Sequence, residues 1–217
     1  MRTTGRLWIR AVSLASVIVL ALASCDMLGL DGGGGGGGNG GNGGSGTTAV
    51  TLPEDVSASF DLGQLALEYY GGNDTTGYNT DVVLVSGGFP LGDVYEGNAG
   101  GVLGPVSHLY LEVWDDSAEG ALTEGSYTVD PTAATSGSVT DVDVYAQAFF
   151  DTAEASFSDS SYTATTGVGG DDTIVGGSVT VSTNEANLVF EFTFELQDGD
   201  TINGSYTGPA DYEKDFS

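Results

Sequence analysis

The stretch that decides the fold is Leu188-Val189-Phe190-Glu191-Phe192-Thr193-Phe194-Glu195-Leu196. Its apolar and polar residues alternate, so its three phenylalanines fall on one face of a strand and its two glutamates on the other. Such a strand packs an aromatic row against a core and leaves its acidic face in water. The segment therefore predicts a β-strand over residues 188–196.

The segments on either side extend this strand into a meander. Asp198-Gly199 follows it, and Asp-Gly favours a tight hairpin turn because glycine accepts a positive φ. Residues 201–207 and 177–182 carry the same alternation on either side. We therefore expect three consecutive antiparallel strands at the C-terminal end.

Earlier segments have the same period of two, and none has the pattern of a helix. Strands are predicted over residues 56–62 (continuing over 66–70), 81–86, 106–114, 127–129, 142–150, 155–157 and 162–164, which makes about nine or ten in all. So many antiparallel strands must close on themselves or stack as two sheets to cover their apolar faces. Uneven strand lengths and the long loops 87–104 and 115–125 favour stacking. We therefore predict an all-β domain, an antiparallel β-sandwich.

The N-terminal segment has the pattern of an export signal. Arg2, Arg6 and Arg10 precede residues 11–21, an apolar stretch without a charge that is too short to span a bilayer. The stretch ends in Leu22-Ala23-Ser24-Cys25, which resembles the lipobox of bacterial lipoproteins. The resemblance implies a thioether-linked diacylglycerol on Cys25, cleavage before it, and acylation of the new amino group.

The residues after the cysteine form the expected linker. They include an unbroken glycine run over residues 32–38 and further glycines up to residue 46. Glycine loses the most backbone entropy on ordering and has no side chain to bury. We therefore divide the chain into a signal peptide (1–24), a lipidated cysteine with a flexible linker (25–47) and a β-sandwich domain (48–217).

A second resemblance concerns the domain itself. Residues 124–129, 174–181 and 198–209 are similar to segments of β-rich domains in uncharacterised bacterial surface lipoproteins. This resemblance implies a sandwich fold and no particular activity.

The charge of the chain excludes several functions. Among 217 residues there are 31 Asp and Glu but only 4 Lys and Arg, which gives a net charge of -27. Three of the four bases lie before residue 11, so cleavage before Cys25 leaves Lys214 as the one base and a net charge of about -30. Nucleic-acid binding is excluded because almost no cations remain to neutralise phosphates. We hypothesise that this acidity reflects a saline habitat, where salt screens the self-repulsion.

Few residues of the chain are suited to catalysis. The single cysteine excludes a disulfide framework, and a catalytic triad would have to use the single histidine, His108, which lies in the middle of a predicted strand. A zinc site lacks its usual ligands. A carboxylate pair of the glycosidase kind stays open, because acids are plentiful. We expect a protein that is not an enzyme.

Two sets of residues are candidates for binding. Acids in predicted turns would suit a calcium ion, which prefers oxygen ligands: Asp171, Asp172, Asp198 and Asp200. Exposed aromatic side chains could stack on sugar rings: Tyr69, Tyr70, Tyr95, Tyr110 and Trp114. The same aspartates are ordinary turn residues, and the same aromatics are ordinary core residues.

The sequence thus favours a lipid-anchored protein of the bacterial cell envelope, facing the periplasm or on the cell surface. Its domain would have a structural role or bind a ligand, with a protein or a glycan as partner. The alternative is a glycan-binding module or a carboxylate-dependent glycoside hydrolase.

Overall fold

A computed structural model describes residues 46–73, 77–117 and 122–216 of the chain. The predicted signal peptide, Cys25 with its predicted lipid and the glycine-rich run of the predicted linker lie outside the described residues.

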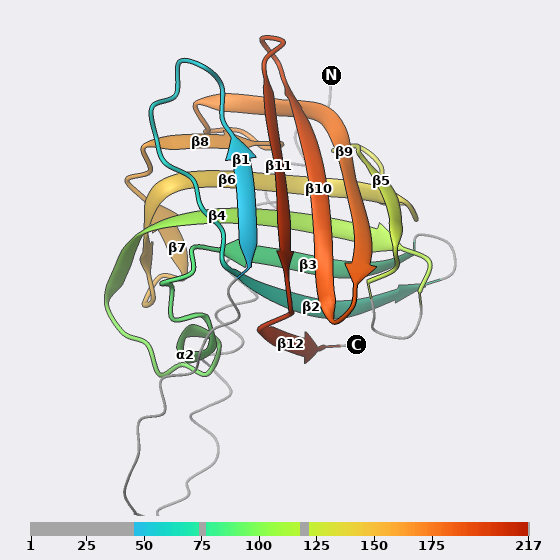
Figure 1. The fold of residues 1–217 in the computed structure, drawn as a ribbon, viewed down its shortest axis with the longest axis horizontal. Coiled ribbons are helices and arrows are strands. Elements are labelled where there is room, and N and C mark those ends of the chain that lie inside the picture. Colours follow the sequence, from blue (N-terminus) through green and yellow to red (C-terminus); the bar gives the residue numbers. More distant parts are fainter. Residues whose placement is uncertain (1–45, 74–76, 118–121, 217) are drawn as a thin grey trace, which may run out of the picture.

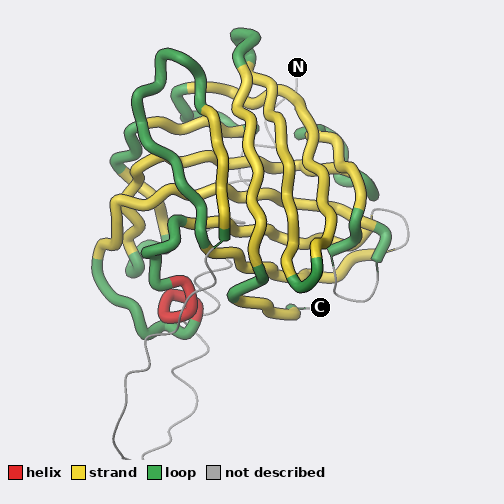
Figure 2. Tube along the Cα trace, viewed as in Figure 1, coloured by secondary structure: helices red, strands yellow, loops and turns green. Residues whose placement is uncertain are grey.

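The described residues form twelve strands and one short helix (Figure 2). The strands are β1 (Thr47–Thr51), β2 (Gln64–Asn73), β3 (Gly77–Val85), β4 (Val102–Asp115), β5 (Gly125–Val129), β6 (Ser138–Asp151), β7 (Ser156–Ser158), β8 (Tyr162–Thr165), β9 (Asp172–Asn184), β10 (Asn187–Leu196), β11 (Thr201–Gly208) and β12 (Tyr212–Asp215). The helix is α2 (Leu91–Tyr95). The fold is therefore all-β.

The strands join in one continuous sheet of mixed direction. Its order is β1-β11-β10-β9-β5-β6-β4-β3-β2-β12, with β7 paired to β6 and β8 paired to both β6 and β9. Most pairs are antiparallel, but β5 with β6, β8 with β9 and β12 with β2 are parallel. The prediction of a purely antiparallel domain was therefore wrong at these three pairs, each of which involves a short strand of four or five residues.

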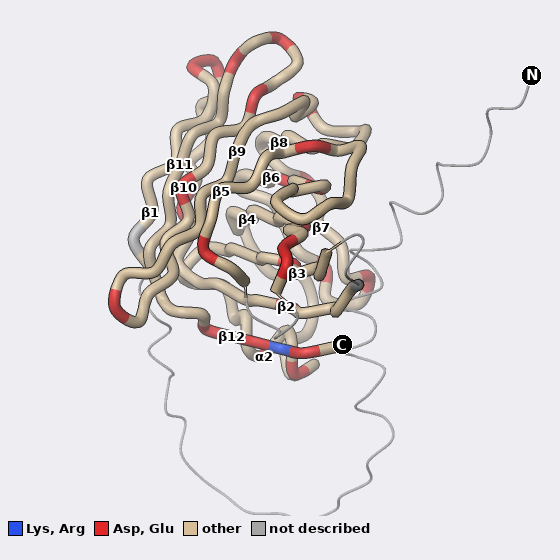
Figure 3. The backbone as a smooth tube through the Cα atoms, turned by 90° about the vertical axis from the view of Figure 1, so that its right-hand side faces the viewer, with Lys and Arg blue, Asp and Glu red and all other residues tan. Residues whose placement is uncertain are grey.

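The sheet folds over on itself. In Figure 1 the strands β1, β11, β10 and β9, which we call the front layer, cross over β2, β3, β4 and β6, which we call the back layer. The side view in Figure 3 shows the two layers facing each other. Strands β5 and β8 pair with β9 of the front layer and with β6 of the back layer, and so connect the two.

The main core takes side chains from both layers. Phe190 and Phe194 of β10 are fully buried, in one cluster with Leu84 of β3 and Leu109 of β4. The phenylalanine face predicted for residues 188–196 is therefore the core-facing side of the front layer. Burial of these large apolar side chains, each contributing about 1.5–3 kcal/mol, holds the layers together.

A smaller apolar cluster lies on the other side of the back layer, which we call its outer face. Helix α2 places Leu91 and Val94 there, against Ala66 of β2, Val85 of β3 and Phe150 of β6. The helix thus covers part of the outer face. The polar residues described below lie beside the helix on the same outer face.

The C-terminal meander is confirmed by the structure. Strand β10 pairs with β9 on one side and with β11 on the other, both antiparallel. The turn between β10 and β11 contains Gly199 with φ of +99°, the conformation for which glycine is favoured.

Other predictions need correction. Residues 56–62 form no strand, although Val56, Ala58 and Phe60 pack against the main core as their alternation indicates. The edge strands β1 and β12 were not predicted, because short strands with few apolar residues give little signal. The predicted loop 87–104 contains α2, where no helix was expected. No helix of the described residues is long and apolar enough to cross a membrane.

Candidate functional site

Four carboxylates stand side by side on the outer face of the back layer. Glu68 of β2 is the register partner of Asp81 of β3, Asp81 is the partner of Glu112 of β4, and Glu112 is the partner of Asp141 of β6. Directly opposite residues in a sheet have Cβ atoms about 4.5–5.5 Å apart. We call Glu68, Asp81, Glu112 and Asp141 the carboxylate row.

The alternation of the strands turns these acids away from the core. Each is the chain neighbour of a fully or almost fully buried core residue: Leu67, Val82, Leu111 and Val142, in the order of the row. In β6 the register shifts beside Asp141, so that one extra residue, Thr140, faces the β4 strand. Thr140 donates a hydrogen bond to Glu112, and such a bulge is a common way to aim an additional side chain at a site.

Glu68 is buried under aromatic side chains. It is 1% exposed, and the Tyr70 hydroxyl donates a hydrogen bond to its Oε2 atom. Tyr95 of α2 is a second hydrogen-bond partner, and its ring stacks on Tyr212 of β12 with centroids 4.3 Å apart. Burial raises the pKa of Glu68 above its usual value, despite these hydrogen bonds.

Asp81 lies in the middle of the back layer and is 4% exposed. The Tyr110 hydroxyl is a hydrogen-bond partner of Asp81, but the Oδ1 atom of Asp81 is buried without any partner. Burial, followed by the charges of Glu112 and Glu68, raises the pKa of Asp81 well above its usual value. An isolated ionised carboxylate in such a place is costly, so the group favours a proton or a cation.

The other half of the row is more accessible and better hydrogen-bonded. Trp114 donates through Nε1 to Thr140 at 2.9 Å, and Thr140 donates in turn to Glu112. Asn79 donates through Nδ2 to Oε1 of Glu112 at 3.2 Å. Asp141 accepts a hydrogen bond from the Thr166 hydroxyl.

Asp143 lies two residues beyond Asp141 on β6, on the same face. Burial and the charge of Asp141 raise its pKa to about 6, although a hydrogen bond from Thr165 opposes the shift. A carboxyl group with this pKa is partly protonated near neutral pH and can donate a proton.

The row has a cation at one end only. Lys214 of β12 is the register partner of Glu68, and among the residues that the structure describes it is the single Lys or Arg, marked blue on β12 in Figure 3. Its ammonium group lies 4.7 Å from the centroid of the Phe216 ring, which stacks on Tyr70. Asp81, Glu112 and Asp141 therefore lie on strands further from this charge.

The aromatic residues singled out from the sequence divide between two environments. Tyr70, Tyr110 and Trp114 lie on the outer face with the row, whereas Tyr69 belongs to the main core. Tyr110 and Tyr95 are nearly buried, with their hydroxyl groups on Asp81 and Glu68. These side chains surround carboxylates rather than forming an exposed platform for a sugar ring.

Three of the four aspartates proposed for calcium have local structural roles. Asp171 accepts a hydrogen bond from the backbone of Thr163 at 2.8 Å, and Asp172 accepts one from the Tyr162 hydroxyl at 2.9 Å. Asp198 accepts one from the backbone N–H of Asp200 at 3.0 Å, within the turn. Across residues 46–73, 77–117 and 122–216, no group of three or more His, Cys, Asp or Glu could hold a metal ion.

His108 is a packed histidine. It is 3% exposed, and its ring lies 4.3 Å from the Phe157 ring and 5.8 Å from the Tyr145 ring. Burial lowers its pKa to about 3, so the imidazole is neutral at physiological pH. A general base needs a pKa nearer to neutrality, so this environment argues against a catalytic triad built on His108.

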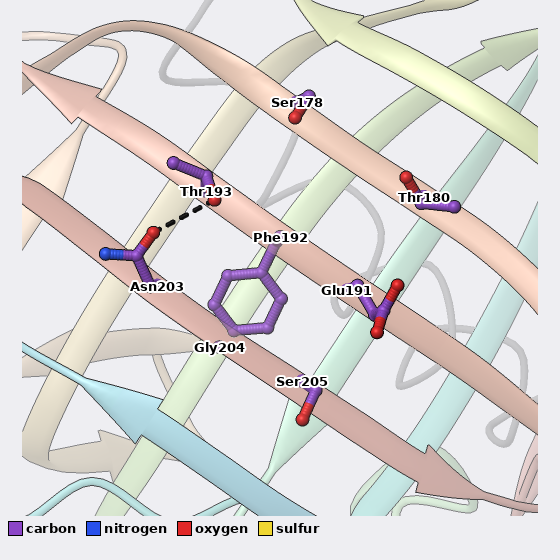
Figure 4. Close-up of a pocket in the computed structure, with 8 residues that line it drawn as sticks. All are labelled: Ser178, Thr180, Glu191, Phe192, Thr193, Asn203, Gly204 and Ser205. Carbon is purple, nitrogen blue, oxygen red and sulfur yellow. Dashed lines mark hydrogen bonds between the residues drawn. The ribbon is translucent and has the colours of Figure 1, made fainter.

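The outer face of the front layer carries a shallow polar depression of about 330 Å³ (Figure 4). It is lined by Ser178, Thr180, Glu191, Phe192, Thr193, Asn203, Gly204 and Ser205. Thr193 donates a hydrogen bond to the side chain of Asn203 at 2.9 Å, drawn as a dashed line. Its small hydroxyl groups and one glutamate make it an ordinary solvated sheet face.

No protein-family model matches this chain, and neither a curated protein sequence nor a solved structure matches it.

Sequence reasoning missed the carboxylate row. It considered acids in turns, whereas these four lie inside strands next to core residues. The available signal was an acid within an apolar run, such as Asp81 directly before Val82-Val83-Leu84-Val85. That signal marks single residues, and the pairing register was needed to show that they form one row.

Proposed function

We propose that this protein is a lipid-anchored component of the bacterial cell envelope whose all-β domain binds a ligand or partner and does not catalyse a reaction. The anchoring part is supported by the segment Leu22-Ala23-Ser24-Cys25 behind a charged and apolar signal. Two or more acyl chains on one cysteine hold a protein stably at a membrane, which a single chain does not. The glycine-rich residues that follow would let the domain move away from the lipid surface.

The binding part of the proposal rests on one observation, the carboxylate row in direct register. Like charges directly opposite each other destabilise a sheet, and here three such pairs are consecutive. Natural proteins break local rules of this kind mainly at functional sites, where the cost in stability is offset by a use. The row therefore supports a binding role for the outer face of the back layer.

The chemistry of the row indicates what it would bind. Its carboxylates are hydrogen-bond acceptors and negative charges, with Lys214 the nearest positive charge of the described residues. A complementary ligand is a cation or a molecule rich in hydrogen-bond donors. A phosphate-bearing ligand would be repelled.

The proposed anchor is tested with Cys25→Ser and with Ser24→Ala as the matched control, since alanine keeps the small residue of the lipobox pattern. We expect Cys25→Ser to lose incorporation of a fatty-acid analogue and to leave the membrane fraction, while Ser24→Ala retains both. Membrane fractionation and labelling in the native host measure this. A Cys25→Ser protein that stays membrane-bound would contradict the anchor.

The same proposal assigns the folded sheet to the β-sandwich class. Its support is the main core shared by both layers, which contains Phe190 and Phe194 of the front layer and Leu84 and Leu109 of the back layer. With the hydrogen-bonded connections through β5 and β8, it would be a sandwich bent from one sheet.

A second candidate function is a carboxylate-dependent glycoside hydrolase, or a glycan-binding module. The observation that favours it is the pKa of Asp143, raised to about 6 beside Asp141, with Trp114 and Tyr145 on the same side of the back layer. Release of reducing sugar from envelope polysaccharides would test it. Activity lost in Asp143→Asn and kept in Asp171→Asn would favour the hydrolase, and no release by the wild-type protein would exclude it for those substrates.

A further inference from the structure

Three buried oxygen atoms of the outer face have no hydrogen-bond partner: Glu68 Oε1, Asp81 Oδ1 and Asn79 Oδ1. Glu68 and Asp81 are register partners on adjacent strands, and Asn79 precedes Asp81 by two positions on β3, hence on the same face. Most buried polar atoms of native proteins are hydrogen-bonded, so three unpartnered atoms on one face of two adjacent strands need an explanation.

All three atoms are acceptors, and the donors around them are already engaged. Tyr70 donates to the other oxygen of Glu68, and Tyr95 also bonds to Glu68. The Tyr110 hydroxyl is bonded to Asp81, and the amide of Asn79 donates to Glu112. The second oxygen of each carboxylate and the carbonyl oxygen of the amide thus remain without a donor.

The two carboxylates are closed off from bulk water. Glu68 is 1% exposed and Asp81 is 4% exposed, so bulk water does not replace the missing partners. Glu112 and Asp141, which are partly exposed, continue the row towards solvent and give a cation a polar route to the buried end.

We infer that Glu68, Asp81 and Asn79 bind a calcium-class divalent cation through these three oxygens, with Glu112 as the next charge along the row. Calcium takes six to eight oxygen ligands from carboxylates, amide carbonyl groups and water, and tolerates irregular geometry. Two carboxylates and one amide oxygen match that set, and water would supply the rest. Magnesium demands near-ideal octahedral geometry and holds its water more tightly, so calcium is the better fit.

This inference rests on the proposed binding role of the row and names the class of its ligand. It places the cation away from the turn aspartates, of which Asp171, Asp172 and Asp198 each accept a local hydrogen bond through one carboxylate oxygen. Weak binding, with a Kd of about 0.1–1 mM, is the usual range of extracellular calcium modules.

The test uses the full-length protein, purified in a neutral detergent, freed of divalent ions with EDTA and kept at constant high NaCl. Calcium chloride is titrated while the melting temperature is followed, with magnesium chloride as the comparison. Terbium provides a second readout, because Tyr70, Tyr95 and Tyr110 around the site would sensitise its luminescence and calcium would compete for it.

The variants Asp81→Asn and Glu68→Gln keep the shape of each side chain and remove its charge. Asp198→Asn, in the exposed turn after β10, is the matched control with the same change of charge. We expect a saturable calcium effect in the wild type and in Asp198→Asn, and affinity weaker by about tenfold or more in both row variants. If one row variant does not fold, judged by near-UV circular dichroism, the other gives the answer.

Three results would overturn the inference. The first is a calcium effect no larger than that of NaCl at equal ionic strength, and the second is an effect unchanged in both row variants. The third is an effect lost only in Asp198→Asn, which would place the ion in the turn. If the wild type binds no calcium but Asp81→Asn melts higher in EDTA, the carboxylate of Asp81 costs stability; the cation is then excluded, while a row kept at a cost for another ligand still stands.

Discussion

Single side chains of the outer face owe their charge state to burial. Burial raises the pKa of Asp143 to about 6 and lowers the pKa of His108 to about 3, so it favours the neutral form of both side chains. The cause is the same desolvation, but the consequences for stability are opposite in pH, because neutralising an acid takes up a proton and neutralising a histidine releases one.

The raised pKa of Asp143 predicts that acidification stabilises the domain through this residue. The folded state binds the proton more tightly than the unfolded state, so the contribution is complete below the ordinary pKa of 3.8 and lost as the pH rises through about 6. Between pH 7 and pH 5 the gain is about 1.4 kcal/mol. We expect Asp143→Asn to remove this gain, measured as the free energy of urea-induced unfolding at both pH values.

His108→Phe provides the comparison for this experiment. The histidine contributes stability above its ordinary pKa of 6.5 that is lost as the pH falls towards 3, about 2 kcal/mol of it between pH 7 and pH 5. On acidification from pH 7 to pH 5, the free energy of unfolding of the phenylalanine variant should therefore rise more, or fall less, than that of the wild type. If both variants keep the wild-type pH dependence, the burial of these two groups does not control it.

At the scale of elements, the sequence predicted the strands that carry several apolar residues and missed β1 and β12, which carry few. Strands β9, β10 and β11 were predicted because their apolar faces are continuous and Asp198-Gly199 marks the turn. Strand β12 was missed because Tyr212-Glu213-Lys214-Asp215 has little apolar character, and its pairing to β2 joins distant parts of the chain. The carboxylate row was missed for the same reason, since its four acids meet only through long-range register.

Gly204 of β11 illustrates a packing constraint within an element. It is the register partner of Phe192, and a Cβ atom on it would lie 2.4 Å from the phenylalanine ring. The ring is 4% exposed and fills the space that a side chain would occupy, so an alanine must displace it or the strand.

We therefore predict that Gly204→Ala destabilises the domain by about 1–3 kcal/mol. Gly125→Ala in β5 is the matched control, because a Cβ atom there meets nothing within 4 Å; its effect should stay within about 0.5 kcal/mol. Chemical unfolding followed by circular dichroism measures both. If the two substitutions destabilise the domain equally, the Phe192 ring can move aside without a loss of stability, and the prediction is wrong.

At the scale of the whole molecule, charge opposes folding. After cleavage before Cys25 the chain would carry 31 acids and one lysine, and Figure 3 shows the acids spread over the loops and both layers. Self-repulsion of this size disfavours the compact state, and salt relieves it by shortening the Debye length from about 10 Å at 0.1 M to about 3 Å at 1 M. The calcium inferred for the row would act locally, at two of these acids only.

Screening by salt and binding of calcium can be separated by the concentration at which each acts and by the residues on which each depends. We predict that the melting temperature of the EDTA-treated protein climbs with NaCl into the molar range, because screening acts on the whole surface. A variant with Glu191→Gln, Glu195→Gln and Asp198→Asn, all exposed at or after β10, should melt higher in low salt and gain less from NaCl. Its response to calcium should remain that of the wild type, because the row is unchanged. A wild-type protein equally stable in low and molar NaCl would mean that the surface charge carries no cost, and the saline hypothesis would then lose its physical basis.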